Sequence, residues 1–540
     1  MMKYQLRIKR QTRAVMTWLM TILSPLPWVG VGGGFLFTAC SDWTDHYEDG
    51  PATGEGLSVM QLLEQDSRTA SFAAQVRQAG YADLLASSQA LTVFAPTQGL
   101  DGSDVGRMVA NHIARHTYPT STPLTVGVEM LNGKIYQFDA DGGFAGTGIT
   151  LANQKADNGL VHQLQTPIPY VNNLYEHIAM RPDLSELYRF IHQFDEVKFD
   201  VENSVEVDID EQGRPVYDSV FVSYNRLLED PVYGLGHIAR EDSTYNMLLP
   251  TNEAWQQAYE RIAPSFRVYD ADDAVADSLQ DLRTRLAIVE NLVYRAAVAG
   301  ADSAVSTTGS VISEPDRLLA GSTALTASNG TAWLCPTLNY DRRETWNKPI
   351  VVEAEQQNGR TYNNTLTSVY QRSLTSSSLI GGVSGEAFIE VMPISTSTNP
   401  TVIFDIPDVL AGTYDIYCVF LPATVEGPTE ELDSTKVNFT LTYLNANGRT
   451  ATKRPSTAEA RELITSGTEV TRMLALSHVE IPVSNTTDRL WLTSETNDPT
   501  TLQTTTSLTI TTNVTAREFS SGTYARSFRL DRIIFEPVKN

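Results

Sequence analysis

Helical periodicity occurs twice in the first two thirds of the chain. Apolar positions three and four residues apart predict helices from Leu57 to Leu63 and from Phe72 to Val76, and again from Leu174 to Ile191. Each helical region is followed by an apolar strand that runs into Pro-Thr, LTVFAPTQGL at 91–100 and YNMLLPTNEAW at 245–255. The same succession of elements therefore occurs twice, which indicates an internal repeat.

A second pair of segments follows in the same order. Each copy predicts a further helix, VGRMVANHIARHTYP at 105–119 and LRTRLAIVENLVYRAAVAG at 282–300. Each then has an Asn-Gly turn, an alternating strand and a proline, ADNGLVHQLQTPIPY at 156–170 and ASNGTAWLCPTLNY at 327–340. Asn-Gly followed by alternation is typical of a hairpin.

This succession resembles the fasciclin domain, an α+β fold with a helical layer on a small β-wedge. TVFAPT and LLPTNEAW are similar to the first signature of that family, and the resemblance covers roughly 55–172 and 173–345. A Tyr-His pair marks the second signature. His116 stands at the histidine position of the first copy with Arg115 before it, whereas the second copy has Tyr294 followed by Arg295. Because the pair is incomplete in both copies, we expect these side chains to be structural.

The second copy has extra length at 205–222, VEVDIDEQGRPVYDSVFV. Asp208, Asp210 and Gly213 resemble part of a calcium loop, but Ser219 stands where an EF-hand needs glutamate. Alternating apolar positions on both sides of the turn favour a hairpin.

From Ile350 onward the helical periodicity disappears and Ser, Thr, Val and Ile dominate. Strand patterns recur at the spacing of a β-sandwich. They are PIVVEAE, EAFIEVMPI, TVIFDIPDV, TYDIYCVF, KVNFTLTYL, HVEIPV, DRLWLTSE, SLTITTNV and SFRLDRIIFEP.

The opening VVEAE, the central FDIPDVLAGTYDIYCVF and the closing SFRLDRIIFEP resemble the jelly-roll carbohydrate-binding modules of families six and thirty-five. The resemblance implies a sugar-binding sandwich. It also implies that Glu353, Glu355 and Asp531 hold a structural Ca²⁺, an ion that prefers such oxygen ligands. Solvated strand carboxylates are the alternative interpretation.

Sugar binding requires exposed aromatic rings, because the apolar face of a pyranose stacks on an aromatic plane. Four aromatic residues outside the alternating core positions are candidates: Tyr362, Tyr370, Trp491 and Tyr524. Core or edge packing is the alternative role for each of them.

The beginning of the chain predicts export. A basic stretch precedes an apolar run from Ala14 to Ala39, and Phe37-Thr38-Ala39-Cys40 resembles a bacterial lipobox, which implies acylation of Cys40. A membrane-spanning helix is the alternative, although Pro25, Pro27 and a triple glycine would break it. The acidic tether after Cys40 resembles the surface-export signal of Bacteroides-type lipoproteins.

Composition excludes several classes of function. The 540 residues include 40 basic and 64 acidic ones, for a net charge of −24, so phosphate-backbone binding is not the main task and no nucleic-acid partner is expected. The chain has only three cysteines, which excludes a disulfide scaffold. Cys335 and Cys418 lie in different predicted domains, and Cys418 alternates with apolar residues on a core face, so a buried thiol is expected there and a disulfide between the two is not.

Catalytic motifs are absent from the sequence. It contains no G-x-S-x-G elbow and no glycine-rich phosphate loop. His112 and His116 would share a helix face, but Ile113 stands where a zinc protease has glutamate.

The sequence therefore predicts a multidomain protein with two α+β fasciclin-like domains followed by an all-β jelly-roll sandwich. The predicted segments are a signal peptide at 1–39, a tether at 40–55, fasciclin-like domains at 56–172 and 173–345, and the sandwich at 346–540.

Three functions fit these segments. The first is a non-catalytic lipoprotein, anchored in the outer-membrane lipid and exposed at the cell surface. It would bind glycans or the transport proteins of a nutrient-uptake assembly, with no cofactor besides the structural Ca²⁺. The second is a structural adhesin or pilus-type component, and the third is an envelope hydrolase that acts through paired carboxylates.

Overall fold

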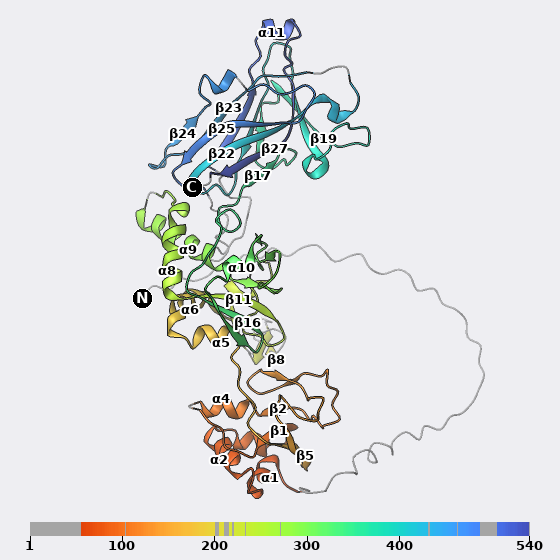
Figure 1. The fold of residues 1–540 in the computed structure, drawn as a ribbon, viewed down its shortest axis with the longest axis vertical. Helices are drawn as coiled ribbons and strands as arrows, with labels where there is room; N and C mark the ends of the chain where they lie inside the picture. The colour runs from red at the N-terminus through yellow and green to blue at the C-terminus, as the bar shows by residue number, and fades with distance from the viewer. Residues whose placement is uncertain are drawn as a thin grey trace, which may run out of the picture.

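The computed structural model describes residues 56–102, 104–199, 205–209, 215–218, 221–232, 234–270, 272–429, 433–461, 463–485 and 505–538. The predicted signal peptide, the tether, Cys40, Trp491 and the predicted strand DRLWLTSE lie outside these residues. Three structural units follow one another along the long axis of the molecule (Figure 1). We name them the first α+β unit (α1 to β6), the second α+β unit (α5 to β16) and the β-sandwich (β17 to β27).

The first α+β unit has a four-stranded sheet with the order β2-β1-β6-β5, in which β1 and β6 are parallel. Its helices are α1 (Val59–Gln65), α2 (Ala70–Gln78), α3 (Ala82–Ala86) and α4 (Val105–Ala110). Its strands are β1 (Leu91–Pro96), β2 (Ile113–Arg115), β3 (Val128–Glu129), β4 (Ile135–Tyr136), β5 (Ile149–Ala156) and β6 (Gly159–Leu164). Strand β1 is buried along its whole length, because the helices cover one face and an aromatic cluster covers the other.

The second α+β unit repeats this sheet as β12-β11-β16-β15, with β11 and β16 parallel. Its helices are α5 (Leu174–Ala179), η1 (Pro182–Leu184), α6 (Ser185–His192), α7 (Arg226–Glu229), α8 (Asn252–Ile262), η2 (Ala263–Phe266), α9 (Asp273–Val289) and α10 (Pro315–Leu318). Its sheet strands are β11 (Tyr245–Pro250), β12 (Val293–Tyr294), β15 (Thr323–Ala327) and β16 (Gly330–Cys335). Smaller strands are β7 (Asp195–Phe199), β8 (Val205–Ile209), β9 (Pro215–Asp218), β10 (Phe221–Asn225), β13 (Ala304–Val305) and β14 (Val311–Ile312).

The two Asn-Gly turns have the same function in both units. Asn158 accepts a hydrogen bond from the backbone N–H of Val59 at 2.8 Å, and Asn329 accepts one from Leu174 at 2.9 Å. Val59 and Leu174 are the first residues of α1 and α5, whose N–H groups have no partner within the helix. Each turn therefore ties the sheet to the first helix of its own unit, as expected of a repeat.

The predicted helices at 105–119 and 282–300 are too long. Helix α4 ends at Ala110 and α9 at Val289, and short strands β2 and β12 follow them. The apolar residues continue beyond the helix ends because those strands pair with the buried strands β1 and β11. Propensity alone does not separate a helix from a strand in such a short apolar run.

The proposed helix face shared by His112 and His116 is wrong for the same reason. His112 follows α4 in a turn, and His116 lies after β2 with a φ of +73°. The assignment of His116 and Arg295 to one family position is also wrong. Leu91 and Tyr245 are equivalent, because each pairs with the glycine of the Asn-Gly turn in its unit. Leu91 pairs with Arg115, and Asn246, which follows Tyr245, pairs with Tyr294, so the position equivalent to Arg115 is Arg295.

The predicted hairpin at 205–222 is confirmed in its central part, where β8 pairs with β9 in antiparallel fashion. Asp208 lies in β8 and pairs with Val216, which is a ladder position and not a position in a calcium loop.

The β-sandwich consists of two antiparallel sheets. One has the order β19-β20-β27-β22-β25, with β17 also paired to β27, and the other has the order β18-β21-β26-β23-β24. The strands are β17 (Ile350–Glu353), β18 (Arg360–Tyr362), β19 (Thr367–Ser373), β20 (Ala387–Pro393), β21 (Thr401–Asp405), β22 (Gly412–Leu421), β23 (Val437–Leu444), β24 (Thr450–Lys453), β25 (Thr471–Ile481), β26 (Ser507–Thr512) and β27 (Phe528–Pro537). Short helices are η3 (Ser384–Glu386), η4 (Ala423–Glu426), η5 (Glu459–Arg461) and α11 (Ala516–Ser520).

The core of the sandwich lies between the two sheets. Tyr414, Ile416, Cys418 and Phe420 alternate along β22 and are all buried in it. Cys418 is a buried free thiol, as expected from the sequence, and Cys335 of the second α+β unit is also free and buried. The residues between these core positions on β22 point to the opposite face of the sheet.

Candidate functional site

The solvent side of the sheet that contains β19, β20, β27 and β22 carries the candidate site, and we call this side the outer face. Tyr370 on β19 pairs with Glu390 on β20, and Glu390 pairs with Arg529 on β27. Arg529 pairs in turn with Leu421 on β22. Directly paired residues point to the same side of a sheet. These four side chains therefore form one row across four strands.

Two members of this row, Glu390 and Arg529, also belong to a closed ring of four charged side chains. Glu390 accepts hydrogen bonds from Arg372 at 2.7 Å and from Arg529 at 2.9 Å. Glu426, on η4, accepts one from Arg529 at 2.7 Å and lies 3.5 Å from Arg372. Glu390 is nearly buried, so its two arginine partners offset the cost of removing its charge from water. The hydrogen bond to Glu390 raises the pKa of Arg372.

Tyr370 is the exposed member of the row. The residue is 48% exposed, and the guanidinium carbon of Arg372 lies 5.3 Å from its ring centroid. Phe388 and Leu421, which pair with Arg372 and Arg529, belong to a small buried apolar cluster with Val425. An exposed aromatic plane next to fixed donors and acceptors is the arrangement that recognises a polar ligand with an apolar face.

The other aromatic candidates lie elsewhere. Tyr362 is also exposed, but it is on β18 and therefore belongs to the opposite sheet. Tyr524 is partly buried, and the ammonium of Lys436 lies 5.2 Å from its ring centroid. The structure thus does not bring Tyr362, Tyr370 and Tyr524 together into one binding row.

The carboxylates of Glu353, Glu355 and Asp531 lie near one another beside η3. Ser384 links two of them, because its N–H donates to Asp531 at 3.0 Å and its hydroxyl donates to Glu353 at 2.7 Å. One oxygen of Glu353 and one of Glu355 are buried with no hydrogen-bond partner in the described part of the chain. Buried carboxylate oxygens of this kind are suitable ligands for a hard cation.

A bulge positions Asp531. Val419 on β22 pairs with Arg532, and the next residue, Phe420, pairs with Leu530, so Asp531 has no partner on that strand. Burial raises the pKa of Asp531 from 3.8 to about 6, and the charges of Glu353 and Glu355 act in the same direction.

The trio does not form a finished metal centre. Among the described residues, His, Cys, Asp and Glu side chains are nowhere grouped in threes or more with a geometry that could hold a metal ion. The donor set of Glu353, Glu355 and Asp531 nevertheless fits Ca²⁺ in its chemistry, because all three supply oxygens and two of them leave one oxygen unpartnered.

A second row on the outer face is apolar. Val351 on β17 pairs with Ile534, Ile534 pairs with Tyr417, and Tyr417 pairs with Leu474 on β25. Val351 and Leu474 are 48% and 42% exposed, and the guanidinium of Arg472 covers the ring of Tyr417 at 3.7 Å. This row offers a surface for contact with another protein.

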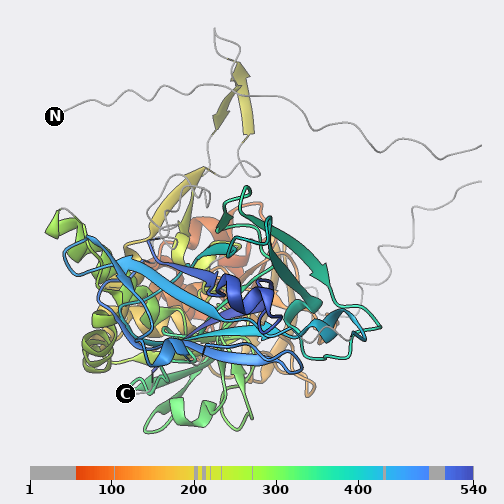
Figure 2. The ribbon, with the colours of Figure 1, turned by 90° about the horizontal axis from the view of Figure 1, so that it is seen from above.

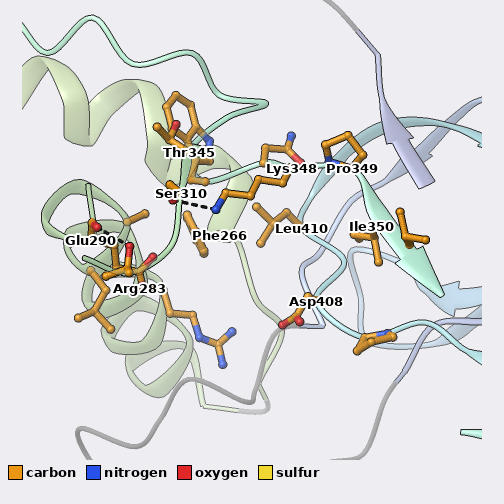
Figure 3. A pocket seen from close by; sticks show the side chains of 17 residues that line it. Phe266, Arg283, Glu290, Ser310, Thr345, Lys348, Pro349, Ile350, Asp408 and Leu410 are labelled. Atoms are coloured by element: carbon orange, nitrogen blue, oxygen red, sulfur yellow. Dashed lines mark hydrogen bonds between the residues drawn. The ribbon is translucent and has the colours of Figure 1, made fainter. Parts of the chain in front are cut away.

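A cavity of about 340 Å³ lies between the second α+β unit and the sandwich. Figure 3 shows Lys348, at the entrance to β17, bonded to Ser310 of the second unit at 2.7 Å. Arg283, Glu290 and Asp408 also line the cavity. Because its lining contains charges of both signs, the cavity does not indicate one class of ligand.

Sequence reasoning missed Arg372, Glu390 and Glu426, and the strands β18, β19 and β24. Strand β19 has the sequence TSVYQRS and is exposed along most of its length. Its mostly polar residues therefore do not show the alternation of apolar and polar positions by which a half-buried strand is predicted. The signal available in the sequence was the spacing of Tyr370 and Arg372, which places both on one side of a strand.

The described residues contain no helix with the length and apolar character needed to span a membrane. The membrane-spanning alternative for the apolar run before Cys40 concerns residues outside the described part.

No family model and no curated protein matches this chain in sequence. Among solved structures, a FAS1 domain pair from the insect cell adhesion molecule fasciclin I is similar to 52% of this chain over 99% of its own length, with 11% identity and a TM-score of 0.18. The xylan-binding domain from CBM22 matches 34% of this chain over 92% of its length, with 13% identity and a TM-score of 0.20.

A family 35 carbohydrate-binding module from Clostridium thermocellum also matches 34% of this chain, over 97% of its own length, with 15% identity and a TM-score of 0.17. The similar structures thus include a FAS1 pair and carbohydrate-binding modules, the two kinds of domain that the sequence motifs resemble. Identities and TM-scores this low carry no information about what this chain binds.

Proposed function

We propose that this protein is a non-catalytic lipoprotein of the cell envelope, and that the outer face of its sandwich binds glycans. The row of Tyr370, Glu390 and Arg529 carries the proposal. It combines an exposed aromatic plane with charged groups that are held in place by their own ion pairs. A sugar ring stacked on Tyr370 would find donors and acceptors for its hydroxyls at the adjacent ring of charges.

Affinity electrophoresis of the full-length protein in gels that contain neutral or acidic polysaccharides tests this proposal. We expect retardation in at least one gel, and loss of that retardation in Tyr370→Ala. Tyr362→Ala is the matched control, because it removes a similarly exposed tyrosine from the opposite sheet. Equal retardation of both variants and the unmodified protein would place any sugar site elsewhere.

We also propose that Ca²⁺ binds beside this site at Glu353, Glu355 and Asp531. The buried oxygens without partners support this site, because a cation would offset the mutual repulsion of the three carboxylates. Repeating the electrophoresis with EDTA separates a Ca²⁺-dependent glycan site from an independent one.

The apolar row from Val351 to Leu474 supports a second candidate function, a structural adhesin whose sandwich contacts other proteins. No retardation by any polysaccharide, together with adhesion of coated beads that is lost in Leu474→Ser, would favour this function over glycan binding.

The proposed location is the outer membrane, with the anchor at acylated Cys40 and the units facing outward, where transport proteins of a nutrient-uptake assembly would be accessible. The basic start, the apolar run and the small residues before Cys40 support this location. Metabolic labelling with an alkyne fatty acid should label the unmodified protein and fail to label Cys40→Ser.

A further inference from the structure

The outer face of the sandwich continues beyond Tyr370 as a strip of apolar side chains along β19 and β20. Ser368 lies on the same side of β19 as Tyr370 and pairs with Met392 on β20. Leu366 and Ile394 follow at the ends of these strands, where the N–H of Ile394 donates to the carbonyl of Leu366 at 3.0 Å. Figure 2 shows β19 and β20, in teal, at one side of the sandwich. We call Tyr370, Met392, Leu366 and Ile394 the edge strip.

The side chains of the edge strip face solvent. Their exposed fractions are 45% for Leu366, 48% for Tyr370, 37% for Met392 and 53% for Ile394. Val391, which precedes Met392 on β20, points to the opposite side of the sheet and is buried in the core of the sandwich. The edge strip is therefore an apolar surface outside the core, directly beside the exposed ring of Tyr370.

The shape of the edge strip suits a chain molecule. Leu366 and Tyr370 are four residues apart, which corresponds to about 13 Å along a strand, and two neighbouring strands together are about 10 Å wide. The resulting area of roughly 130 Å² is far smaller than the surface of about 800 Å² that each partner buries in a stable protein complex. A polysaccharide chain is one sugar ring wide, so it can cover such a strip along its whole length.

The charges beside the edge strip favour an uncharged chain. Arg372 and Arg529 each contact both Glu390 and Glu426, so this ring of two cations and two anions has no net charge. An anionic sugar would have to displace one of these carboxylates from its arginines, and it would approach a protein with a net charge of −24. Neutral hydroxyls can add to the ring without displacing anything, because a guanidinium has five N–H groups and a carboxylate accepts several hydrogen bonds.

We propose that a neutral, extended polysaccharide chain lies along β19 and β20, with one sugar on Tyr370 and further sugars on Met392, Leu366 and Ile394. This inference rests on the proposed glycan site and specifies its ligand, the inner part of a chain of uncharged sugars. The side chains of the edge strip contact the apolar C–H faces of successive rings, while the ring of charges binds the hydroxyls of the sugar on Tyr370. Affinity therefore increases with the number of sugars in the chain.

Isothermal titration calorimetry of the full-length protein with oligosaccharides of two and of six sugars tests the proposal. The neutral probes are cello-, xylo- and manno-oligosaccharides, which are β-1,4-linked and extended. A β-1,4-linked chain of six glucuronic acids is the acidic counterpart of the cello-hexasaccharide. The double variant Leu366→Ser, Ile394→Ser shortens the edge strip. Val305→Ser, Val311→Ser is the control, because these valines form a similarly exposed cross-strand pair on β13 and β14.

We expect at least one neutral hexasaccharide to bind about tenfold or more tightly than its disaccharide. The strip variant should bind this hexasaccharide about tenfold more weakly and the disaccharide with unchanged affinity, whereas Tyr370→Ala should weaken the binding of both. The control variant should match the unmodified protein. Amide hydrogen exchange at 366–373 should slow when the hexasaccharide binds, which tests the site without any substitution.

Three results would overturn this inference and leave the proposed glycan site in place. They are equal affinities for the disaccharide and the hexasaccharide that both depend on Tyr370, binding of the acidic hexasaccharide as tight as that of the neutral one, and unchanged hexasaccharide binding by the strip variant. The third result would leave the edge strip to a partner protein. No binding of any of these oligosaccharides would also overturn the inference, and retardation in the polysaccharide gels then decides whether the proposed glycan site itself fails.

Discussion

The ammonium of Lys134 in the first α+β unit donates a hydrogen bond to Glu241 in the second unit, at 2.6 Å. It also donates to Glu176 at 2.9 Å and to Ser328 at 2.8 Å, so all three of its N–H groups are used. Lys134 is only 2% exposed. Burial raises the pKa of Glu176, but hydrogen bonds from Tyr170 and Lys134 outweigh it and bring that pKa below its usual value. This lysine therefore joins the two units through a buried charge cluster.

Lys134→Met should uncouple the two α+β units. Removing the cation leaves two carboxylates without their partner, at a cost of about 3 kcal/mol. In differential scanning calorimetry of the unmodified protein, we expect the two α+β units to unfold in one shared transition. In Lys134→Met we expect this transition to split into two. Lys453→Met, at an exposed position of β24, should change nothing. Adding Glu241→Met should recover part of the loss, and no recovery would mean that the carboxylate is not the source of the cost.

Gly159→Ala and Gly330→Ala should each destabilise their own unit. A Cβ atom at Gly159 would overlap the carbonyl of Leu91, and one at Gly330 would overlap the carbonyl of Tyr245. Both carbonyls belong to buried strands that cannot move away without breaking the parallel pairing. We expect a loss of roughly 2–3 kcal/mol in urea unfolding.

Gly381→Ala is the control for these two variants, because a Cβ atom there meets nothing within 4 Å. Its stability should match that of the unmodified protein. A neutral result at only one of Gly159 and Gly330 would show that the two turns are not equivalent.

Acid should weaken the first unit through His112. Burial lowers the pKa of His112 from 6.5 to about 4. Its ring is bonded to the carbonyl of Met108 at 2.8 Å and accepts the N–H of Ile168 at 2.9 Å, so only the neutral form fits. Between pH 6.5 and 4 the unfolded chain binds the proton that the folded chain rejects, and stability falls as the pH falls.

The loss in that window should reach roughly 2–3 kcal/mol. Urea unfolding at pH 7, 6, 5 and 4 measures it, with His112→Gln as the variant that removes the titration. We expect the variant to be less stable at pH 7 and to have a flatter dependence on pH. Parallel curves for the two proteins would exclude His112 as the cause.

Asp531→Asn should stabilise the sandwich at neutral pH when Ca²⁺ is absent. The folded-state pKa of about 6 lies above the ordinary 3.8, so the ionised form is disfavoured by folding. The stability contributed by the protonated form is complete below pH 3.8 and is lost as the pH rises through 6. At pH 7.5 in EDTA we expect a gain of roughly 1–3 kcal/mol for the variant, which disappears toward pH 4.

Calcium should reverse the order of stability of the unmodified protein and Asp531→Asn. If Glu353, Glu355 and Asp531 bind Ca²⁺, millimolar CaCl₂ raises the melting temperature of the unmodified protein and has little effect on Asp531→Asn. MgCl₂ at the same concentration is the control for a general ionic effect. Equal shifts in both proteins, or none in either, would contradict a calcium site at this trio.

Local sequence patterns were sufficient for much of the fold. The apolar strands before Pro-Thr became β1 and β11, and the two Asn-Gly turns precede β6 and β16. These elements were predictable because buried strands and tight turns constrain the residue type at each position. Exposed strands such as β19 carry no such constraint, so their sequences do not distinguish them from loops.

The candidate site was predictable only in part. Tyr370 could be named as an aromatic residue outside the core pattern, but its neighbours Glu390, Arg529 and Glu426 come from 20 or more positions away in the chain. Strand order and register bring them together, and a single sequence contains no record of either.

The sequence by itself determined the internal repeat, the change from helical to strand periodicity near Ile350, the buried thiol of Cys418 and the acidic character of the protein. These properties depend on residue type and on spacing along the chain. Only the tertiary structure decided that Lys134 joins the two α+β units, that a bulge places Asp531 next to Glu353 and Glu355, and that the outer face has one charged and one apolar row. Such relationships arise because strand pairing and the packing of units bring together residues that are distant in sequence, where burial then changes the energy of each charge.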